Sequence, residues 1–279
     1  MADYSDREKA EREQKKEMTV RRRREEVRLR VEYKTVCNGK YDISCKVYLP
    51  DAGRIRRVIL GVHGFAGEKE SSALRKLAET AAPLQTALVS FDFPAHGESP
   101  VREEYFTVEN CRNDLLFMAE YVRKEFPQAQ KLLFATSFGG YIALLCAEEL
   151  EDFRFVLRAP AVTMGEHILL PNILQMTEEE FREKGSVLCG FKRFFLLPYA
   201  FYEELRKHPV MGRTFRSPML IVQGDADDVV PPEDIREFCG RNENAMLKMI
   251  PGADHRLKKP GEIEQAVAAA IAYYTGEKM

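Results

Sequence analysis

Residues 131–140 read Lys-Leu-Leu-Phe-Ala-Thr-Ser-Phe-Gly-Gly, an apolar run that stops at a serine and leads into a helix-forming run at 141–150. A serine held at a sharp strand-to-helix turn presents its hydroxyl outward, and the strained turn accepts only small neighbours. Gly139 meets this requirement two residues after Ser137. Ala135 stands two residues before it, where such turns usually have glycine. The stretch predicts a buried strand, a tight turn and a nucleophilic Ser137.

The alternation of strand and helix continues on both sides of this stretch. Short apolar or β-branched runs predict strands at residues 58–62, 87–91, 131–135, 153–157, 219–222 and 246–250. Helical patterns lie between them, at residues 71–82, 108–126, 139–150, 232–239 and 261–274. Nearly continuous apolar strands that alternate with helices indicate an α/β fold with a mostly parallel sheet covered on both faces. Ligands bind at the C-terminal ends of the strands in such sheets.

The chain is expected to divide into four parts. Residues 1–26 are almost all charged or polar and are expected to form a solvated N-terminal extension. Apolar and polar residues then alternate around a tight turn at Asn38-Gly39, which predicts a β-hairpin. The core is expected to span residues 27–160 and 216–279. The aromatic-rich residues 161–215 are too many for an ordinary connection, so we expect them to form a small inserted cap over the strand ends.

Composition narrows the class of protein. Hydrophobic residues make up 45% and charged residues 31% of the 279 residues, and the net charge of −2 gives no reason to expect nucleic acid as a partner. No apolar run approaches the roughly 18 residues that span a bilayer, and the charged N-terminus predicts no secretory signal, so no membrane partner is expected. The six cysteines lack C-x-x-C spacing. They are expected to be buried thiols of a cytoplasmic monomer or homodimer.

A serine nucleophile needs a base that takes its proton during the attack. Imidazole suits that role because its pKa lies near neutrality, and activity is then expected to fall below about pH 6. Of the five histidines, His255 is the best candidate, because it lies in a loop directly after the last predicted strand. His167 and His208 fall in the predicted cap and are expected to be structural or exposed.

The base in turn needs a carboxylate that fixes its tautomer and stabilises its charged form. Three aspartates follow the apolar run 219–222. Asp227 is favoured over Asp225 and Asp228 by its spacing from Gly224 and from Val230-Pro231. The resulting order along the chain, serine then acid then histidine, distinguishes this arrangement from other triad folds.

The oxyanion that develops during attack needs donors that are already in position. The sequence His63-Gly64-Phe65-Ala66-Gly67 follows a predicted strand, and its glycines allow a backbone N–H to turn inward. The backbone amides of Phe65 and Phe138 are the expected donors.

Taken together, these motifs resemble the α/β-hydrolase family. The resemblance rests on His63-Gly64-Phe65, the 92–99 loop Asp-Phe-Pro-Ala-His-Gly-Glu-Ser, the serine turn, the aspartate loop and Gly252-Ala253-Asp254-His255, and it covers residues 28–276. It implies a Ser137–His255–Asp227 triad that works without a cofactor or metal. It also implies that His96 and Ser99 belong to a structural loop.

Within that family the chain looks most similar to the cinnamoyl and feruloyl esterase branch, whose short cap shapes the acyl pocket. This resemblance implies that aromatic cap residues contact the acyl group of a small-molecule ester, namely Phe191, Phe195, Tyr199 and Tyr202. Core packing of the cap is the alternative role for these side chains. Arg158, Lys192 and Arg193 are expected at the surface, where they could also meet a substrate carboxylate.

The predicted function is therefore that of a serine carboxylesterase. A peptidase or acyltransferase of the same fold stays open, because the sequence does not fix the acyl acceptor. A catalytically silent binding protein is a further alternative, although no member of the predicted triad is missing. A metal enzyme is not expected, since the sequence has no H-E-x-x-H motif and no clustered Cys/His spacing.

Overall fold

The computed structural model describes residues 29–277. The predicted charged extension at residues 1–26 and the last two residues of the chain lie outside the described part.

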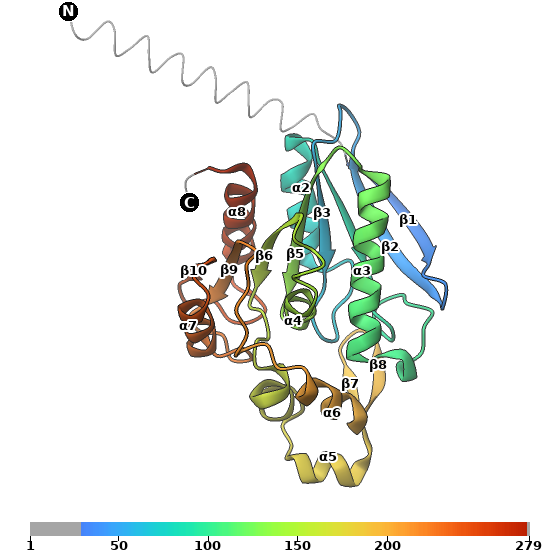
Figure 1. Ribbon diagram of the computed structural model, residues 1–279, viewed down its shortest axis with the longest axis vertical. Coiled ribbons are helices and arrows are strands. Elements are labelled where there is room, and N and C mark those ends of the chain that lie inside the picture. Colours follow the sequence, from blue (N-terminus) through green and yellow to red (C-terminus); the bar gives the residue numbers. More distant parts are fainter. Residues whose placement is uncertain (1–28, 278–279) are drawn as a thin grey trace, which may run out of the picture.

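An eight-stranded sheet forms the centre of the molecule, in the strand order β1-β2-β4-β3-β5-β6-β9-β10 (Figure 1). β2 runs antiparallel to both β1 and β4, and every other neighbouring pair is parallel. The mostly parallel sheet is thus confirmed. The strands are β1 (Leu29–Cys37), β2 (Asp42–Pro50), β3 (Arg57–Val62), β4 (Thr86–Phe91), β5 (Gln130–Thr136), β6 (Phe153–Arg158), β9 (Met219–Gly224) and β10 (Ala245–Ile250).

Helices cover both faces of this sheet. Apolar residues of α2 (Ser72–Ala81) and α8 (Glu262–Thr275) pack on one face. Those of α3 (Val108–Glu125), α4 (Phe138–Leu145) and α7 (Pro232–Arg241) pack on the other. Short helical turns lie at η1 (Ala82–Leu84) and η2 (Glu103–Tyr105). Two apolar layers therefore bury the central strands and fix the strand ends in space.

Helix α4 ends at Leu145, five residues before the predicted end at Leu150. The amides of Ala147 and Glu149 bond carbonyls three residues back instead of four, so the chain turns more tightly there. The turn brings Leu150 into the core, where it is fully buried.

Strand β1 is less buried than its alternation predicts. The hairpin and its turn are confirmed, but Val31 and Tyr33 lie on the exposed side, and Tyr33 is 63% exposed. The reason is the position of β1 at the edge of the sheet, where it pairs only with β2.

Three of the six cysteines are buried as predicted, Cys45, Cys111 and Cys146, whereas Cys37 at the end of β1 is exposed.

Between β6 and β9 the chain leaves the sheet and forms the segment that is predicted to be the cap, and we keep that name for it (Figure 1). The cap consists of a helical segment η3 (Met164–Leu174), α5 (Glu178–Lys184), a two-stranded hairpin of β7 (Ser186–Gly190) and β8 (Phe194–Pro198), and α6 (Tyr199–Lys207). Two polar contacts tie α6 to the core. The Glu204 carboxylate accepts the first amides of α3, from Val108 at 2.8 Å and Glu109 at 2.9 Å, and the Tyr141 hydroxyl donates to His208 O. A carboxylate at a helix N-terminus accepts hydrogen bonds from the free amides and interacts favourably with the positive end of the helix dipole.

Candidate active site

Ser137 lies at the turn between β5 and α4, with φ at +51°. Its amide donates to Arg158 O on the neighbouring strand at 2.9 Å, which holds the strained backbone in place. Gly139 is required here, because a Cβ at this position would lie 2.4 Å from His63 O. Ala135 is fully buried, so its methyl group fits the place where glycine is usual.

The structure joins Ser137, His255 and Asp227 in one chain of hydrogen bonds. His255 Nε2 lies 3.1 Å from Ser137 Oγ, and His255 Nδ1 lies 2.8 Å from Asp227 Oδ2. With the neutral imidazole protonated at Nδ1, the carboxylate accepts that proton and Nε2 is free to accept from the serine hydroxyl. Each of these residues lies at or just after the C-terminal end of a strand, on β5, β9 and β10.

Several donors hold the Asp227 carboxylate in its orientation. The amides of Val229 and Val230 donate to Oδ1, at 2.9 and 2.8 Å, and Gln223 Nε2 donates to Oδ2 at 3.0 Å. Asp225 instead accepts the Gly252 amide, and Asp228 is exposed. Gln223 was not singled out from the sequence. Its signal was its place at the end of β9, four residues before the acid.

The His255 loop is fixed against the Asp227 loop by close backbone contacts. The Ala226 amide donates to Ala253 O at 3.1 Å, and a Cβ on Gly224 would lie 2.2 Å from that same oxygen. Arg158 Nη1 donates to His255 O at 2.6 Å. Burial lowers the pKa of Arg158 to about 10, while Asp227 and Asp254 oppose that change. The expected surface position of Arg158 is therefore wrong, because the guanidinium lies beneath the histidine loop.

Arg158→Met is expected to lower kcat/KM for an ester substrate about ten- to a hundredfold, because a small displacement of His255 is costly to the reaction. Arg154→Met is the matched control, since Arg154 lies on the same strand but stacks on Tyr273 of α8. Steady-state kinetics on both variants check the prediction. Equal activities of the two variants would contradict a positioning role for Arg158.

The predicted oxyanion loop lies directly beside the serine. A Cβ on Gly64 would lie 3.2 Å from Ser137 Cβ, so a side chain there would press on the serine turn. The Phe65 and Phe138 side chains pack together, with ring centroids 6.3 Å apart. The geometry brings the two loops that carry the predicted donor amides into contact. The donor role of these amides stays a prediction.

Two buried histidines connect the Phe65 loop to the 92–99 loop by hydrogen bonds. The Phe93 amide donates to His63 Nε2 at 3.1 Å, and the Ala66 amide donates to His96 Nε2 at 3.0 Å. The other ring nitrogen of each histidine lies 2.8 Å from a carbonyl, so both imidazoles are neutral and protonated at Nδ1. Burial lowers the pKa of His63, and burial together with His63 lowers the pKa of His96 to about 3.

The neutral His96 predicts a loss of stability in acid. The unfolded chain binds its proton below about pH 6.5 and the folded chain only near pH 3, so lowering the pH between these values favours unfolding. We expect this group to cost about 1.4 kcal/mol of unfolding free energy per pH unit. Urea unfolding of wild type and His96→Asn from pH 7 to 4 measures it as a difference in slope. Parallel slopes would contradict the prediction. Burial raises the pKa of Asp114 to about 7, so this carboxyl group stabilises the folded chain as the pH falls. Wild type and His96→Asn both contain Asp114, so its contribution cancels when their slopes are compared.

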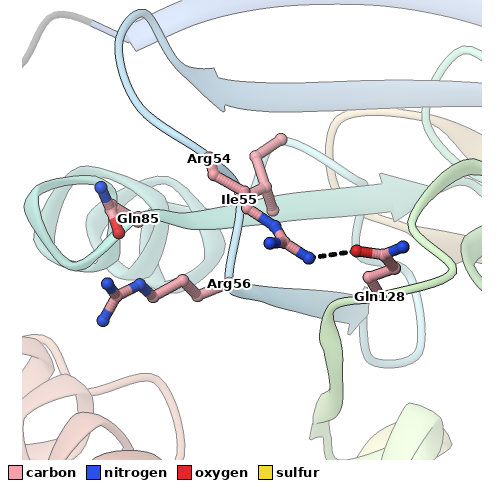
Figure 2. Close-up of a pocket in the computed structure, with 5 residues that line it drawn as sticks. All are labelled: Arg54, Ile55, Arg56, Gln85 and Gln128. Carbon is pink, nitrogen blue, oxygen red and sulfur yellow. Dashed lines mark hydrogen bonds between the residues drawn. The ribbon is translucent and has the colours of Figure 1, made fainter.

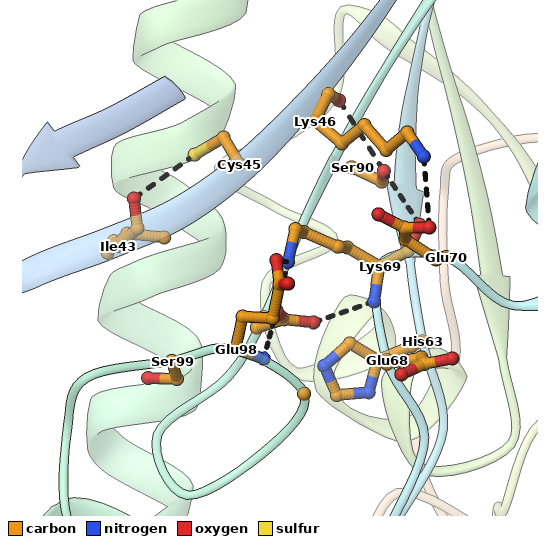
Figure 3. Close-up of polar contacts among 12 residues, drawn as sticks. Ile43, Cys45, Lys46, His63, Glu68, Lys69, Glu70, Ser90, Glu98 and Ser99 are labelled. Atoms are coloured by element: carbon orange, nitrogen blue, oxygen red, sulfur yellow. Dashed lines mark hydrogen bonds and ion pairs between the residues drawn. The ribbon is translucent and has the colours of Figure 1, made fainter. Parts of the chain in front are cut away.

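A buried ion pair also connects the Phe65 loop to the 92–99 loop. Lys69 Nζ lies 2.7 Å from Asp92 Oδ2 and 2.6 Å from Glu98 Oε2, and Figure 3 shows Lys69 pointing toward Glu98. Burial works to lower the pKa of Lys69, but hydrogen bonds to both carboxylates outweigh it and raise the pKa. Gly97 is required at φ +48°, because a Cβ there would lie 2.4 Å from Asp92 Oδ1.

Comparison with known proteins identifies the architecture. A structure of Est1E from Butyrivibrio proteoclasticus with ferulic acid bound is 20% identical, with a TM-score of 0.78, and the match covers 88% of this chain and 98% of that one. The chain has the α/β-hydrolase fold. The mouse α/β-hydrolase domain-containing protein 10 is 17% identical, with a TM-score of 0.70 and coverage of 88% and 99%. A serine hydrolase without a lid from Xanthomonas campestris is 19% identical, with a TM-score of 0.61 and coverage of 88% and 94%.

The sequence model of the serine aminopeptidase S33 family matches residues 53–185. No curated protein matches the sequence. At these identities the similar structures show the fold, and together with the family match they support a hydrolase.

Within residues 29–277, no group of three or more His, Cys, Asp and Glu side chains is placed so that it could hold a metal ion.

The four aromatic residues predicted to bind substrate lie in three different environments within the predicted cap. Phe195 is buried beside Phe65, with ring centroids 5.8 Å apart. Tyr199 and Tyr202 donate their hydroxyls to Glu178 inside the cap. Phe191 is exposed at the hairpin turn. Substrate contact by any of them stays a prediction, and for the first three the structure gives a packing contact as well.

A separate cavity of 350 Å³ lies at the opposite end of the sheet, where β3, β4 and β5 begin (Figure 2). It is lined by Arg54, Ile55, Arg56, Gln85 and Gln128. Ser137 follows the other end of β5, so this cavity does not belong to the candidate site.

Proposed function

We propose that this chain is a serine ester hydrolase. The observation that carries the proposal is the chain of hydrogen bonds from Ser137 Oγ through His255 to the buried Asp227. Nucleophile, base and orienting acid within hydrogen-bond reach are the arrangement that acyl transfer through a serine requires. The α/β-hydrolase fold is in keeping with this arrangement.

In the proposed reaction Ser137 Oγ attacks the acyl carbon while His255 Nε2 takes the hydroxyl proton. The Phe65 and Phe138 amides donate to the oxyanion, and Asp227 stabilises the imidazolium that forms. Collapse of the tetrahedral intermediate breaks the bond to the leaving alcohol, which receives the proton from His255. Water then attacks the acyl-enzyme with His255 again as base. The acid is released and Ser137 regains its proton.

The proposed substrates are esters of short or aromatic acids, including hydroxycinnamates. Two observations support this class. Phe65 lies half-buried beside the serine turn, held there by the buried Phe106 and Phe138, and Est1E, which has the same fold, is known with ferulic acid bound. Aromatic side chains such as Phe65 stack on phenolic rings, which favours aromatic acyl groups.

An aminopeptidase is the second candidate, because the family whose model matches residues 53–185 is described as serine aminopeptidase. The two candidates share the proposed triad and differ in the leaving group. Parallel assays of amino-acyl anilides and of phenyl, naphthyl and hydroxycinnamoyl esters separate them.

The first test is the intact mass after exposure to a fluorophosphonate, for wild type, Ser137→Ala and the control Ser186→Ala. We expect a single adduct on wild type and on Ser186→Ala, and none on Ser137→Ala. Folded wild type without an adduct would mean that Ser137 is not activated. The silent binding protein would then be the better hypothesis.

A further inference from the structure

The hairpin of β7 and β8 has one buried and one exposed apolar face. Phe195 and Leu197 point into the core and are at most 4% exposed. On the other face Leu188 and Leu196 are register partners across the two strands, and Phe194 follows on the same face of β8. With Phe191 in the turn, these four side chains are between 47% and 66% exposed.

This concentration is unusual within the described part of the chain. Eight large hydrophobic residues are exposed between residues 29 and 277, and four of them lie on this hairpin. Single exposed apolar residues are common on soluble proteins, whereas a contiguous set marks a surface that contacts a partner.

The charges at the hairpin indicate the chemistry of that partner. Residues 186–198 contain Lys192 and Arg193 in the turn and no acidic residue. Arg256 stacks on Phe191, with its guanidinium 4.1 Å from the ring centroid. Arg193 and Arg256 therefore place positive charge at the tip of the apolar face, where Lys192 is paired with Glu68. A second copy packed turn against turn would bring like charges together. An anionic phospholipid surface, in contrast, offers negative headgroups directly above an apolar layer.

We propose that the exposed face of the β7–β8 hairpin docks on an anionic phospholipid bilayer. The composition predicts no membrane partner because no apolar run is long enough to span a bilayer, and within residues 29–277 no helix is long and apolar enough to do so. Surface docking needs no spanning segment. It needs only apolar side chains that enter the headgroup region beside cations that attract it.

The hairpin turn is anchored on both sides of the candidate active site. Lys192 pairs with Glu68, just after the Phe65 loop, and Arg193 Nη1 donates to Ser99 O. Phe191 lies under Arg256, the residue after His255. Docking on a bilayer would therefore bring the loops that flank Ser137 and His255 close to the lipid surface. This consequence, unlike the docking itself, rests on the proposed esterase function.

The test is flotation of the purified chain with phosphatidylcholine vesicles, with and without phosphatidylserine. Ser137→Ala is used as the background, so that binding is measured without turnover. We expect binding to the anionic vesicles, weakened by salt, and a loss of about tenfold or more in partitioning for Leu188→Ser/Phe194→Ser. Met246→Ser on β10 removes a comparably exposed side chain elsewhere and is expected to bind as the background does.

Each other outcome overturns the proposal. No flotation of the background protein excludes docking, and equal binding by the hairpin double variant places the contact elsewhere. A dimer seen by analytical ultracentrifugation that the double variant converts to monomer, without vesicle binding, assigns the face to self-association. Thermal unfolding of the double variant controls for its folding. Fluorophosphonate labelling of chains that retain Ser137 is independent of vesicles, so failure of docking and failure of the proposed function are distinguishable.

Discussion

Ser137→Ala is expected to lower kcat/KM for ester hydrolysis on the order of 10⁴-fold or more, which leaves only the catalysis that oxyanion donors and binding supply. The physical reason is that Ser137 Oγ is the only hydroxyl within residues 29–277 that lies within hydrogen-bond distance of His255 Nε2, at 3.1 Å. Without Ser137 Oγ no acyl-enzyme forms. Steady-state rates with a naphthyl ester, measured at matched folded concentrations, check the prediction.

Two further variants sharpen this result. His255→Ala is expected to match the loss of Ser137→Ala, and the double variant is expected to lose little more, because residues that act as one unit are not additive. The thermal midpoints of all three are expected to stay close to wild type, since the serine turn is held by backbone contacts to Arg158 and Ala161. Residual activity of Ser137→Ala within tenfold of wild type would remove the serine from the mechanism.

Much of this architecture was predictable because buried parallel strands leave a strong local pattern. The runs that became β3, β4 and β5 are apolar along their length, and their predicted limits differ from the observed ones by one residue. The candidate triad could be named for a related reason. Ser137 and Asp227 each follow such a strand, His255 follows the less buried edge strand β10, and parallel strands bring their C-terminal ends to one edge of the sheet.

What the sequence did not indicate depends on contacts between distant segments. In the sequence Arg158 is an ordinary charged residue at a strand end. Its partner, the His255 carbonyl oxygen, comes 97 residues later in the chain. The exposure of Tyr33 follows from the edge position of β1, which alternation alone does not encode. The two buried histidines are similar, because nothing in their local sequence shows that each accepts an amide from the loop of the other.

Lys69→Met is expected to lower the free energy of unfolding by about 3 kcal/mol or more. The substitution leaves the Asp92 carboxylate buried without its cation, and removing one partner of a buried ion pair costs about 3–5 kcal/mol. The amides of Lys69 and Glu98 still donate to Asp92, which places the expected loss at the lower end of that range. Urea unfolding at pH 7 measures it.

The control is Lys76→Met, which breaks the exposed pair between Lys76 and Glu264. Exposed pairs contribute about 0–1 kcal/mol, so this variant is expected to remain close to wild type. Lys69→Met/Asp92→Asn is expected to recover part of the loss, because the variant no longer buries an unpaired charge. Equal stabilities of Lys69→Met and Lys76→Met would contradict the assignment.

The pH dependence of the same variant gives an independent reading of the pair. The folded state raises the pKa of Lys69, so its contribution to stability is fully present below the ordinary lysine pKa and is lost only as the pH rises through the folded value. The difference between wild type and Lys69→Met should therefore be constant from pH 7 to 9 and shrink only in strong alkali. Because the Lys69 ammonium joins Asp92 and Glu98 of the 92–99 loop to the end of the Phe65 loop, the variant should also lose activity before it unfolds. Such a loss would tie the stability of the ion pair to the geometry of the proposed oxyanion donors.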